Sequence, residues 1–417
     1  MERRASFRLA FLALALPAVA AAQTKNDQDL LKAAKKGDVA KVQALVAAGA
    51  DVNVRNKDGR TPLIEAARES KAEAVRALLD KGASPDVADK DARTALLEAC
   101  KRGSGDVARA LLGSRADVNL ADKDGNTALM EAAKKDDAGL VHQLIVAGAD
   151  VNAADDDGWT ALLEAAQKGR LTIAQELVRA KANLEARIER GSTALMLAAG
   201  RGDSNMGNLL VDAGADFNAE SGVGNPVLLL AASGGAEALV ARLLKEGVPV
   251  DVEGSGGYTP LAAAAEAGQD DVVDALLDAH ANPNHESGSQ RMTPVMLAAK
   301  ACKDGPIDDL RFKGARLDYQ AEDGSTALML AAECSSSSVV SALMMGGARD
   351  DRQDDSGRTA LMRAAALGHQ STVDSILFSG NPKIDRRDRD GRSALDHARR
   401  GKHQEVVDKL IAAGARE

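Results

Sequence analysis

The chain has 417 residues and a formal net charge of −9, which argues against nucleic acids and anionic membrane surfaces as general partners. Hydrophobic residues make up 45% of the chain, which is ample for a core, whereas aromatic residues make up only 2%. We therefore expect short, closely packed helices rich in Ala and Leu.

Residues 1–22 have the pattern of a secretory signal peptide. Arg3, Arg4 and Arg8 form a basic start, residues 9–16 form an apolar run, and small residues up to Ala22 suit cleavage. A buried or frayed N-terminal helix is the alternative. Removing these residues takes away three Arg and one Glu, which changes the net charge to −11.

No later apolar run is long enough to cross a bilayer, so we expect an exported protein without membrane insertion. The periplasm is the expected location, with the extracellular space as the alternative.

Residues 23–417 repeat one motif, seen as Gly125-Asn126-Thr127-Ala128-Leu129, at steps of 33 or 34 residues. We take the Thr of this motif as the anchor from which positions in each repeat are counted. In two repeats another residue stands in its place. The anchors are Thr61, Thr94, Thr127, Thr160, Thr193, Pro226, Thr259, Thr293, Thr326, Thr359 and Ser393. A fixed period of this size predicts a stacked array, in which each repeat buries its apolar side against its neighbours.

Each repeat predicts two helices and a polar turn. Thr127 suits the N-cap of a first helix, and a Pro after the anchor, as at Pro62, suits the first helical position. A second helix carries apolar residues at helical spacing, as in Val75, Leu78 and Leu79. Gly-Ala-Asp, as at residues 148–150, then ends that helix before the turn.

These residues resemble the ankyrin repeat, and the resemblance covers essentially all of residues 28–417. It implies an all-α solenoid of about twelve helix-turn-helix units joined by β-turn fingers. We expect polar caps at both ends, because the first and last units are rich in charge. One departure is systematic: the His that follows Thr-Pro-Leu in the family is replaced here, for example by Met130 and Met362. The Thr–His hydrogen bond typical of the family therefore lacks its partner.

The three cysteines, Cys100, Cys302 and Cys334, are all expected on first helices of their repeats. Cys100 is too far along the array to reach the other two. Cys302 and Cys334 belong to adjacent repeats, but packed helices stand roughly 8–10 Å apart, which is wider than a disulfide normally tolerates. Free thiols are therefore expected.

The resemblance places the turn tips and the first helices on a concave face, where partners of ankyrin arrays usually bind. Trp159, Tyr258 and Met292 precede their anchors at these tips, and large side chains there suit a binding hot spot. The alternative is that each of them packs on the neighbouring turn.

Four first helices carry Glu at the same position: Glu65, Glu98, Glu131 and Glu164. Arg102, Lys135 and Lys168 follow at i+4, so surface ion pairs explain this row. A basic strip runs beside it and is a candidate surface for a protein partner. The strip consists of Lys101, Arg102, Lys134, Lys135, Lys168 and Arg201. In the next five repeats the Glu position becomes apolar, which predicts that the concave face changes from charged to apolar near the middle of the chain. The residues there are Leu197, Leu230, Ala263, Leu297 and Leu330.

Units 6 to 8 have Gly- and Ser-rich turns, such as residues 253–257. Flexible turns, a bend, a site that orders on binding, or simple surface drift would each explain them. We find no calcium loop, because the first ligand position is apolar each time, and no metal spacing or catalytic motif. The sequence therefore predicts a monomeric, non-enzymatic scaffold that binds a protein partner and no cofactor. A secreted effector that binds proteins of another cell, or an enzyme or metal site in units 6 to 8, are the alternatives.

Overall fold

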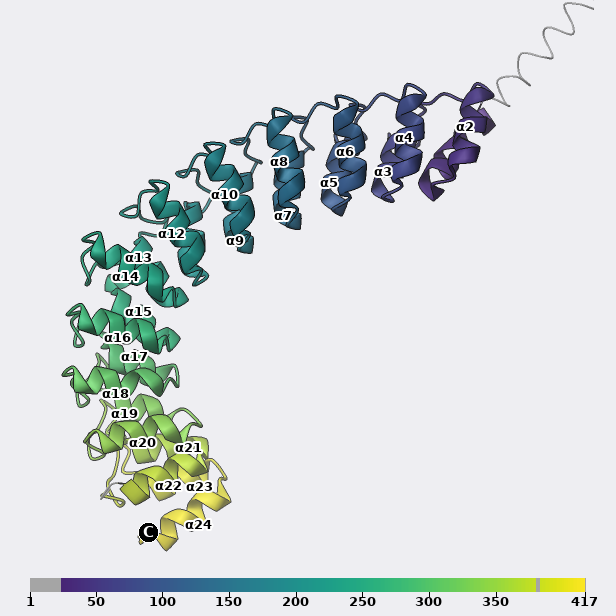
Figure 1. Ribbon diagram of the computed structural model, residues 1–417. Helices are drawn as coiled ribbons and strands as arrows, with labels where there is room; N and C mark the ends of the chain where they lie inside the picture. Colours follow the sequence, from purple (N-terminus) through teal and green to yellow (C-terminus); the bar gives the residue numbers. More distant parts are fainter. Residues whose placement is uncertain (1–23, 380–382, 417) are drawn as a thin grey trace, which may run out of the picture. The chain divides into compact units, whose positions relative to one another are not determined.

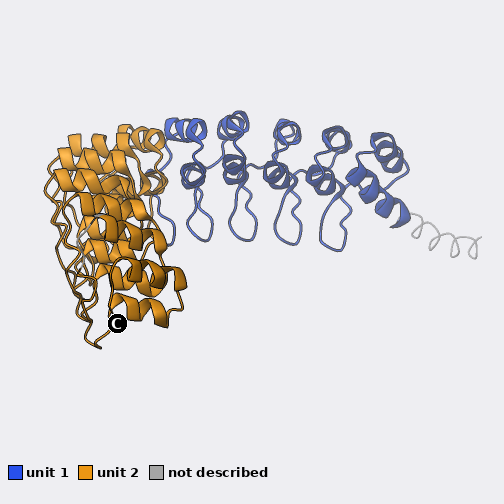
Figure 2. Cartoon of the chain, turned by 90° about the horizontal axis from the view of Figure 1, so that it is seen from below, with its two compact units in different colours: residues 1–189 blue, residues 190–417 orange. Residues whose placement is uncertain are grey.

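The computed structural model describes residues 24–379 and 383–416, so the signal peptide expected at residues 1–22 lies outside the described residues. In the described part, helices alternate with turns, and the only β-type pairing is three isolated bridges. The chain divides into two compact units, residues 1–189 and residues 190–417 (Figure 2).

Every repeat in the described residues contributes one pair of antiparallel helices, and there are twelve such pairs (Figure 1). We call the first member of each pair the inner helix and the second the outer helix. The pairs of unit 1 are residues 24–36 with α2 (Val39–Ala47), α3 (Pro62–Arg68) with α4 (Ala72–Asp80), α5 (Ala95–Arg102) with α6 (Gly105–Gly113), α7 (Ala128–Lys135) with α8 (Ala138–Val146), and α9 (Ala161–Lys168) with α10 (Leu171–Arg179).

Unit 2 continues the same alternation, with one short 3-10 turn, η1 (Ser255–Gly257), in its irregular region. Its pairs are α11 (Ala194–Gly200) with α12 (Ser204–Asp212), α13 (Val227–Gly234) with α14 (Glu237–Lys245), α15 (Pro260–Ala267) with α16 (Asp270–Asp278), α17 (Pro294–Lys300) with α18 (Gly305–Phe312), α19 (Ala327–Ala332) with α20 (Ser337–Met345), α21 (Ala360–Leu367) with α22 (Gln370–Ser379), and α23 (Ala394–Arg400) with α24 (Gln404–Ala412).

The anchor residues begin the inner helices as expected. Thr127 lies in extended backbone, and its hydroxyl accepts a hydrogen bond from the Met130 backbone N–H at 3.4 Å. Pro226 and Thr293 are the exceptions, because neither makes this side-chain bond. The residue that replaces the family's His also takes part in capping: the Thr359 backbone N–H lies 3.5 Å from the Met362 sulfur. The N-cap prediction is therefore confirmed at most repeats, and a thioether stands where an imidazole would.

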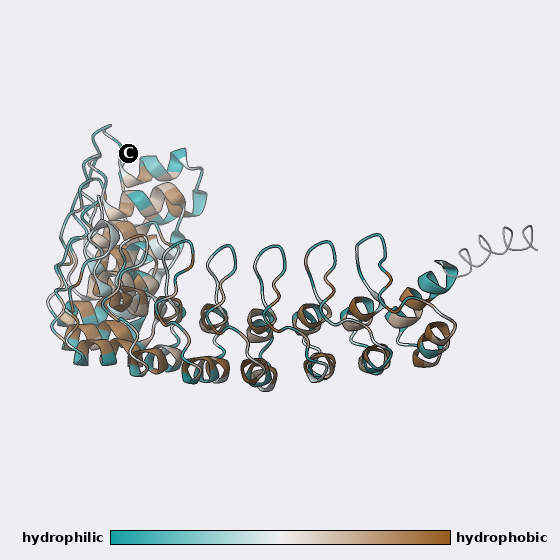
Figure 3. Cartoon of the chain, turned by 90° about the horizontal axis from the view of Figure 1, so that it is seen from above, coloured by the Kyte–Doolittle hydropathy of each residue, from teal (hydrophilic) through white to brown (hydrophobic). Residues whose placement is uncertain are grey.

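Finger loops precede the inner helices, and in unit 1 they all project from the same side of the helix layers (Figure 2). In four of these fingers an Asp or Asn organises the turn, as at Asp122, whose carboxylate accepts from the backbone N–H groups of Asp124 at 3.1 Å and Asn126 at 2.9 Å. Neighbouring fingers are joined by a backbone bond, as from Lys123 N to Asp91 O at 3.1 Å. The stack thus has a polar ladder beside its core, and the finger loops of unit 1 are mostly hydrophilic (Figure 3).

The core lies between the helix layers and between successive repeats. Leu129, Ala132 and Ala133 of α7 and Leu144 of α8 are at most 1% exposed. Full burial of one such Leu contributes about 1.5–3 kcal/mol, whereas the Ala pair contributes mainly by letting the neighbouring inner helices approach. Since each repeat contacts chiefly its neighbours, stability is distributed along the array.

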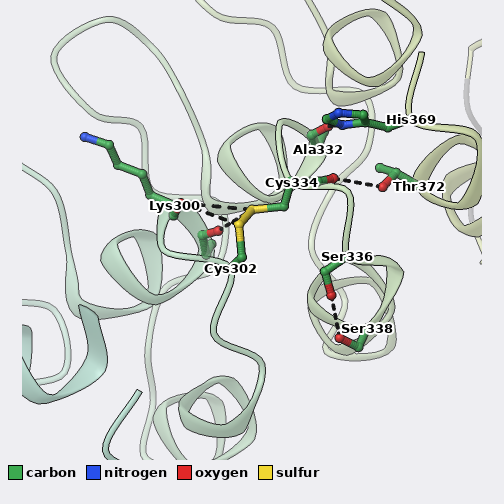
Figure 4. The surroundings of a disulfide bond; sticks show 9 residues. Lys300, Cys302, Ala332, Cys334, Ser336, Ser338, His369 and Thr372 are labelled. Atoms are coloured by element: carbon green, nitrogen blue, oxygen red, sulfur yellow. Dashed lines mark hydrogen bonds between the residues drawn. A yellow bond between two sulfur atoms is a disulfide. The ribbon is translucent and has the colours of Figure 1, made fainter. Parts of the chain in front are cut away.

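The expectation of three free thiols is wrong for two of the cysteines. Cys302 and Cys334 form a disulfide between adjacent repeats of unit 2, with Cα atoms 5.9 Å apart (Figure 4). Neither lies on an inner helix, because α17 ends at Lys300 and α19 at Ala332. The spacing of helix axes therefore does not apply to them: both lie in the turns beyond the helix ends, where Cys302 adopts a left-handed conformation with φ 61°. Cys100 is free and buried in α5, as expected.

Thiol titration of protein purified without reductant checks this assignment. The folded protein is expected to show no reactive thiol at pH 8, because burial, followed by the charges of Glu131 and Asp137, raises the Cys100 pKa to about 12. Unfolding without reductant should release one thiol per chain, and unfolding with reductant three. Three thiols without reductant would contradict the disulfide.

Candidate partner-binding groove

A charged groove of about 610 Å³ lies on the inner-helix side of unit 1. It is lined entirely by charged side chains from α3, α5, α7 and α9 and from one finger. They are Arg68, Arg93, Glu98, Lys101, Arg102, Glu131, Lys134, Lys135, Glu164 and Lys168. Seven of these residues are basic and three are acidic, although the chain as a whole is acidic.

The three carboxylates form the floor of this groove. Glu98, Glu131 and Glu164 are 3%, 7% and 9% exposed, and successive inner helices place them at the same position. The Lys134 Nζ lies 3.2 Å from a Glu131 oxygen and 3.4 Å from a Glu164 oxygen, and so bridges two repeats. The Arg68 Nε on α3 lies 3.5 Å from a Glu98 oxygen on α5 and so links these two neighbouring repeats.

The i+4 ion pairs expected from the sequence do not form. Arg102, Lys135 and Lys168 lie in the groove lining but have no ion pair among the described residues. The reason is geometric: Lys134, at i+3 from Glu131, also reaches the carboxylate of the next repeat, so it satisfies two carboxylates at once. The Glu row is thus held by bridges between repeats and not by pairs along one helix.

Burial and charge oppose each other at these groups. Burial raises the pKa of Glu164, and the nearby Lys134 offsets only part of that rise. For Lys134 burial lowers the pKa, but Glu131 and Glu164 together outweigh it, so the pKa stays above its ordinary value. Lys134 is therefore firmly charged, and it is engaged by the floor carboxylates. The other basic groups therefore remain available to a partner on the exposed side of the groove.

Four basic side chains, Lys101, Arg102, Lys135 and Lys168, form no ion pair among the described residues while lining the groove. Lys101 is half-buried and the other three are exposed. A row of unpaired cations above a floor of satisfied carboxylates can accept carboxylates from a partner without displacing an internal bond.

Unit 2 has a smaller hollow of about 350 Å³ at its irregular turn. Tyr258 lines it with Leu229 and Ala263, which are buried, and Glu266 stands at its edge. Burial, followed by the charge of Glu266, raises the Tyr258 pKa. The turn is tied to its neighbour, since Gly288 N donates to Gly256 O at 2.8 Å.

The remaining sequence candidates lie elsewhere. Trp159 is half-buried, and its backbone N–H donates to Asp155 at 2.8 Å in the finger before α9. Met292 is 7% exposed and forms an isolated bridge with Ser287, so it presents little side chain to a partner. Arg201 is exposed at the end of α11 in unit 2 and does not line the charged groove.

The basic strip predicted from the sequence leaves out Arg68 and the finger residue Arg93, and the sequence pattern assigned the Glu row only to surface pairing. Counting from the anchors would have found both: Arg68 holds the same repeat position as Lys101 and Lys134, and Arg93 the same as Trp159. Burial of the Glu row could not be read from the sequence, because it depends on how closely the Ala-rich helices approach.

No group of three or more potential metal ligands occurs in the part of the chain that the structure describes. Within residues 24–379 and 383–416, no helix combines the length and the apolar character that a bilayer crossing requires.

Comparison with known proteins supplies the family. The family described as ankyrin repeats (3 copies) matches residues 30–122, 129–221, 195–287, 295–388 and 351–416. No curated protein matches the chain. The matched segments span both units and nearly all the described helices. The chain therefore belongs to the ankyrin-repeat family.

Proposed function

We propose that this protein is an exported scaffold that holds an acidic segment of a protein partner in the charged groove of unit 1. Family membership indicates a protein-interaction scaffold. One observation carries the finer proposal: in a chain of net charge −9, seven basic side chains gather in one groove, and four of them have no ion pair within the described part of the chain.

The size of the groove sets the length of the segment. Inner helices of successive repeats stand about 10 Å apart, so the stretch from α5 to α9 is about 20 Å long. An extended chain advances about 3.3 Å per residue, so roughly six residues lie along it. Because the binding groups are charged and three of the four are exposed, affinity should fall steeply as salt shortens the Debye length below about 10 Å.

Export is supported by two features of the chain. Residues 1–22 have the signal-peptide pattern, and the Cys302–Cys334 disulfide suits an oxidising compartment. The periplasm is the location that we propose. Recovery of the protein mainly from the culture medium would favour the secreted-effector alternative instead.

The test uses a fluorescent eight-residue peptide of Asp and Glu, followed by anisotropy at two salt concentrations. Lys101→Glu with Lys135→Glu should weaken binding at least tenfold, because two attractive contacts become repulsive. Lys81→Glu is the matched control: it removes an exposed Lys of unit 1 at the end of α4, outside the groove, and should leave binding unchanged. Binding that survives the groove substitutions, or that is insensitive to salt, would refute the groove assignment.

A further inference from the structure

Three large apolar side chains are exposed at equivalent places on successive outer helices of unit 2. Phe312 ends α18, Met345 ends α20, and Phe378 stands one residue before the end of α22. Their exposed fractions are 72%, 78% and 93%. The residues are 33 apart in the chain, and the three helices pack side by side, so the side chains form one row. We call this row the outer stripe.

The stripe is not a general property of the repeat. In the other repeats that have an anchor residue, the same position is mostly charged. It holds Asp80, Gly113, Val146, Arg179, Asp212, Lys245 and Asp278 before the stripe, and Ala412 after it. Val146 is the one other large apolar residue among them, and its neighbours in the row are Gly113 and Arg179. Isolated exposed apolar residues need no explanation, but three in consecutive repeats form a contiguous patch. Ile411, half exposed on α24, lies one residue before the equivalent position.

Charged residues of opposite sign flank the stripe. One helical turn before it, the outer helices expose Asp308, Asp374 and Asp408. After it, the turns that follow the helices expose Arg316, Arg349 and Arg416. In unit 1 the equivalent turns carry acidic residues such as Asp117 and Asp150 instead. The apolar row therefore has an acidic side and a basic side.

We propose that the outer stripe is the interface at which two copies of this chain form a symmetric dimer. With a two-fold axis along the stripe, the apolar row of each copy lies on the apolar row of its partner. The acidic and basic sides of the partner are then reversed relative to those of the first copy. The acidic side of one copy then faces the basic side of the other, twice. A two-fold axis along the helices would set acidic residues against acidic ones, so the charges select the first arrangement. This dimer departs from the monomer expected from the sequence and is independent of the proposed groove.

The available area suits such a contact. Four outer helices about 10 Å apart, each of about nine residues at 1.5 Å per residue and followed by a turn, present a face of roughly 600–800 Å². A standard stable interface buries about 800 Å² on each partner. Exposed aromatic and Met side chains are the types enriched at the centres of interfaces.

Local contacts do not block the interface. Asp308 pairs with Arg311 at 3.0 Å, Asp374 with Lys409 at 2.5 Å and Arg349 with Asp351 at 3.1 Å, but the flank residue of each pair is exposed and such pairs exchange at little cost. The Arg311 guanidinium lies 4.1 Å from the centre of the Phe312 ring, which covers one face of the ring and leaves the other free.

Sedimentation equilibrium of the purified protein over a concentration series is the first test. The natural protein should dimerise, and Phe378→Asp should raise the dimer dissociation constant about thirtyfold or more. Val146→Asp is the matched control, because it places the same charge at the same repeat position on α8, where the side chain is 74% exposed. It should leave the dissociation constant unchanged. A monomer at every concentration, or a dimer that tolerates Phe378→Asp, would overturn the proposal.

A mixing experiment tests whether the charged flanks meet in the interface. One variant carries Asp308→Lys with Asp374→Lys, and a second carries Arg316→Glu with Arg349→Glu. Each alone should fail to dimerise, because like charges then face each other on both flanks. An equimolar mixture should form a heterodimer, since the reversed flanks are complementary. Dimerisation of either variant alone would contradict the arrangement.

Discussion

Replacing Arg363 with Met is expected to lower the free energy of unfolding by about 3–5 kcal/mol. Arg363 lies on α21 and is 7% exposed. Its guanidinium binds Asp354 at 2.7 Å, Glu333 at 2.8 Å and the Ser325 hydroxyl at 2.6 Å. Without it, Arg358, at 3.4 Å and partly exposed, is the one cation among the described residues that still pairs with the buried Asp354 carboxylate. A buried carboxylate that loses its closest cation is costly, and urea denaturation measures that cost.

A second substitution separates the lost charge pair from lost packing. Asp354→Asn keeps a side-chain oxygen that can accept from two backbone N–H groups of the finger. These are the N–H groups of Ser356 and Arg358, which donate to Asp354 at 2.8 and 2.9 Å. Asn56 already fills this role in the repeat of α3. The double variant should therefore recover about half of the loss or more, because it removes the unpaired charge. No recovery would show that Arg363 acts through packing alone.

Replacing Gly234 with Ala is expected to lower the free energy of unfolding by about 1–3 kcal/mol, although Ala ordinarily stabilises a helix relative to Gly by roughly 1 kcal/mol. A Cβ at Gly234, the last residue of α13, would stand 2.3 Å from the Ala199 carbonyl oxygen and 2.8 Å from the Gly202 nitrogen. Both are backbone atoms of the preceding repeat, so the helices must move apart.

Gly113→Ala provides the matched control for this prediction. Gly113 is the last residue of α6, and a Cβ there meets nothing within 4 Å. This variant should be neutral or more stable by up to about 1 kcal/mol. Opposite signs at the two glycines, measured by urea denaturation, would confirm that close helix packing and not helix propensity decides the effect at Gly234. A stabilised Gly234→Ala would contradict it.

The same repeat position is used differently along the array. On α3 it holds Glu65, which accepts from the Asn56 side chain of its own finger at 3.0 Å. On α21 it holds Arg363, which binds Asp354 at the equivalent finger residue. On α23 it holds His397, which lies 2.8 Å from Asp388. The contact between inner helix and finger is thus retained, while the charges of its two members change.

The sequence by itself determined the repeat period, the helix starts, the family and much of the charged groove. These features follow from local chemistry: Thr at an N-cap, Gly at a turn, and apolar residues at helical spacing are read directly along the chain. Lys101, Arg102, Lys134, Lys135 and Lys168 were predicted as one strip, and all five line the groove.

Only the tertiary structure decided which of these side chains meet. Lys134 bridges two repeats because inner helices stand close enough for one ammonium group to reach both carboxylates. Cys302 and Cys334 pair because the chain turns just beyond two helix ends, a conformation that helix spacing does not describe. The outer stripe depends likewise on which helix faces remain uncovered. Contacts between repeats depend on how closely neighbouring backbones approach and on which side chains stay exposed. Neither can be read from a repeat pattern.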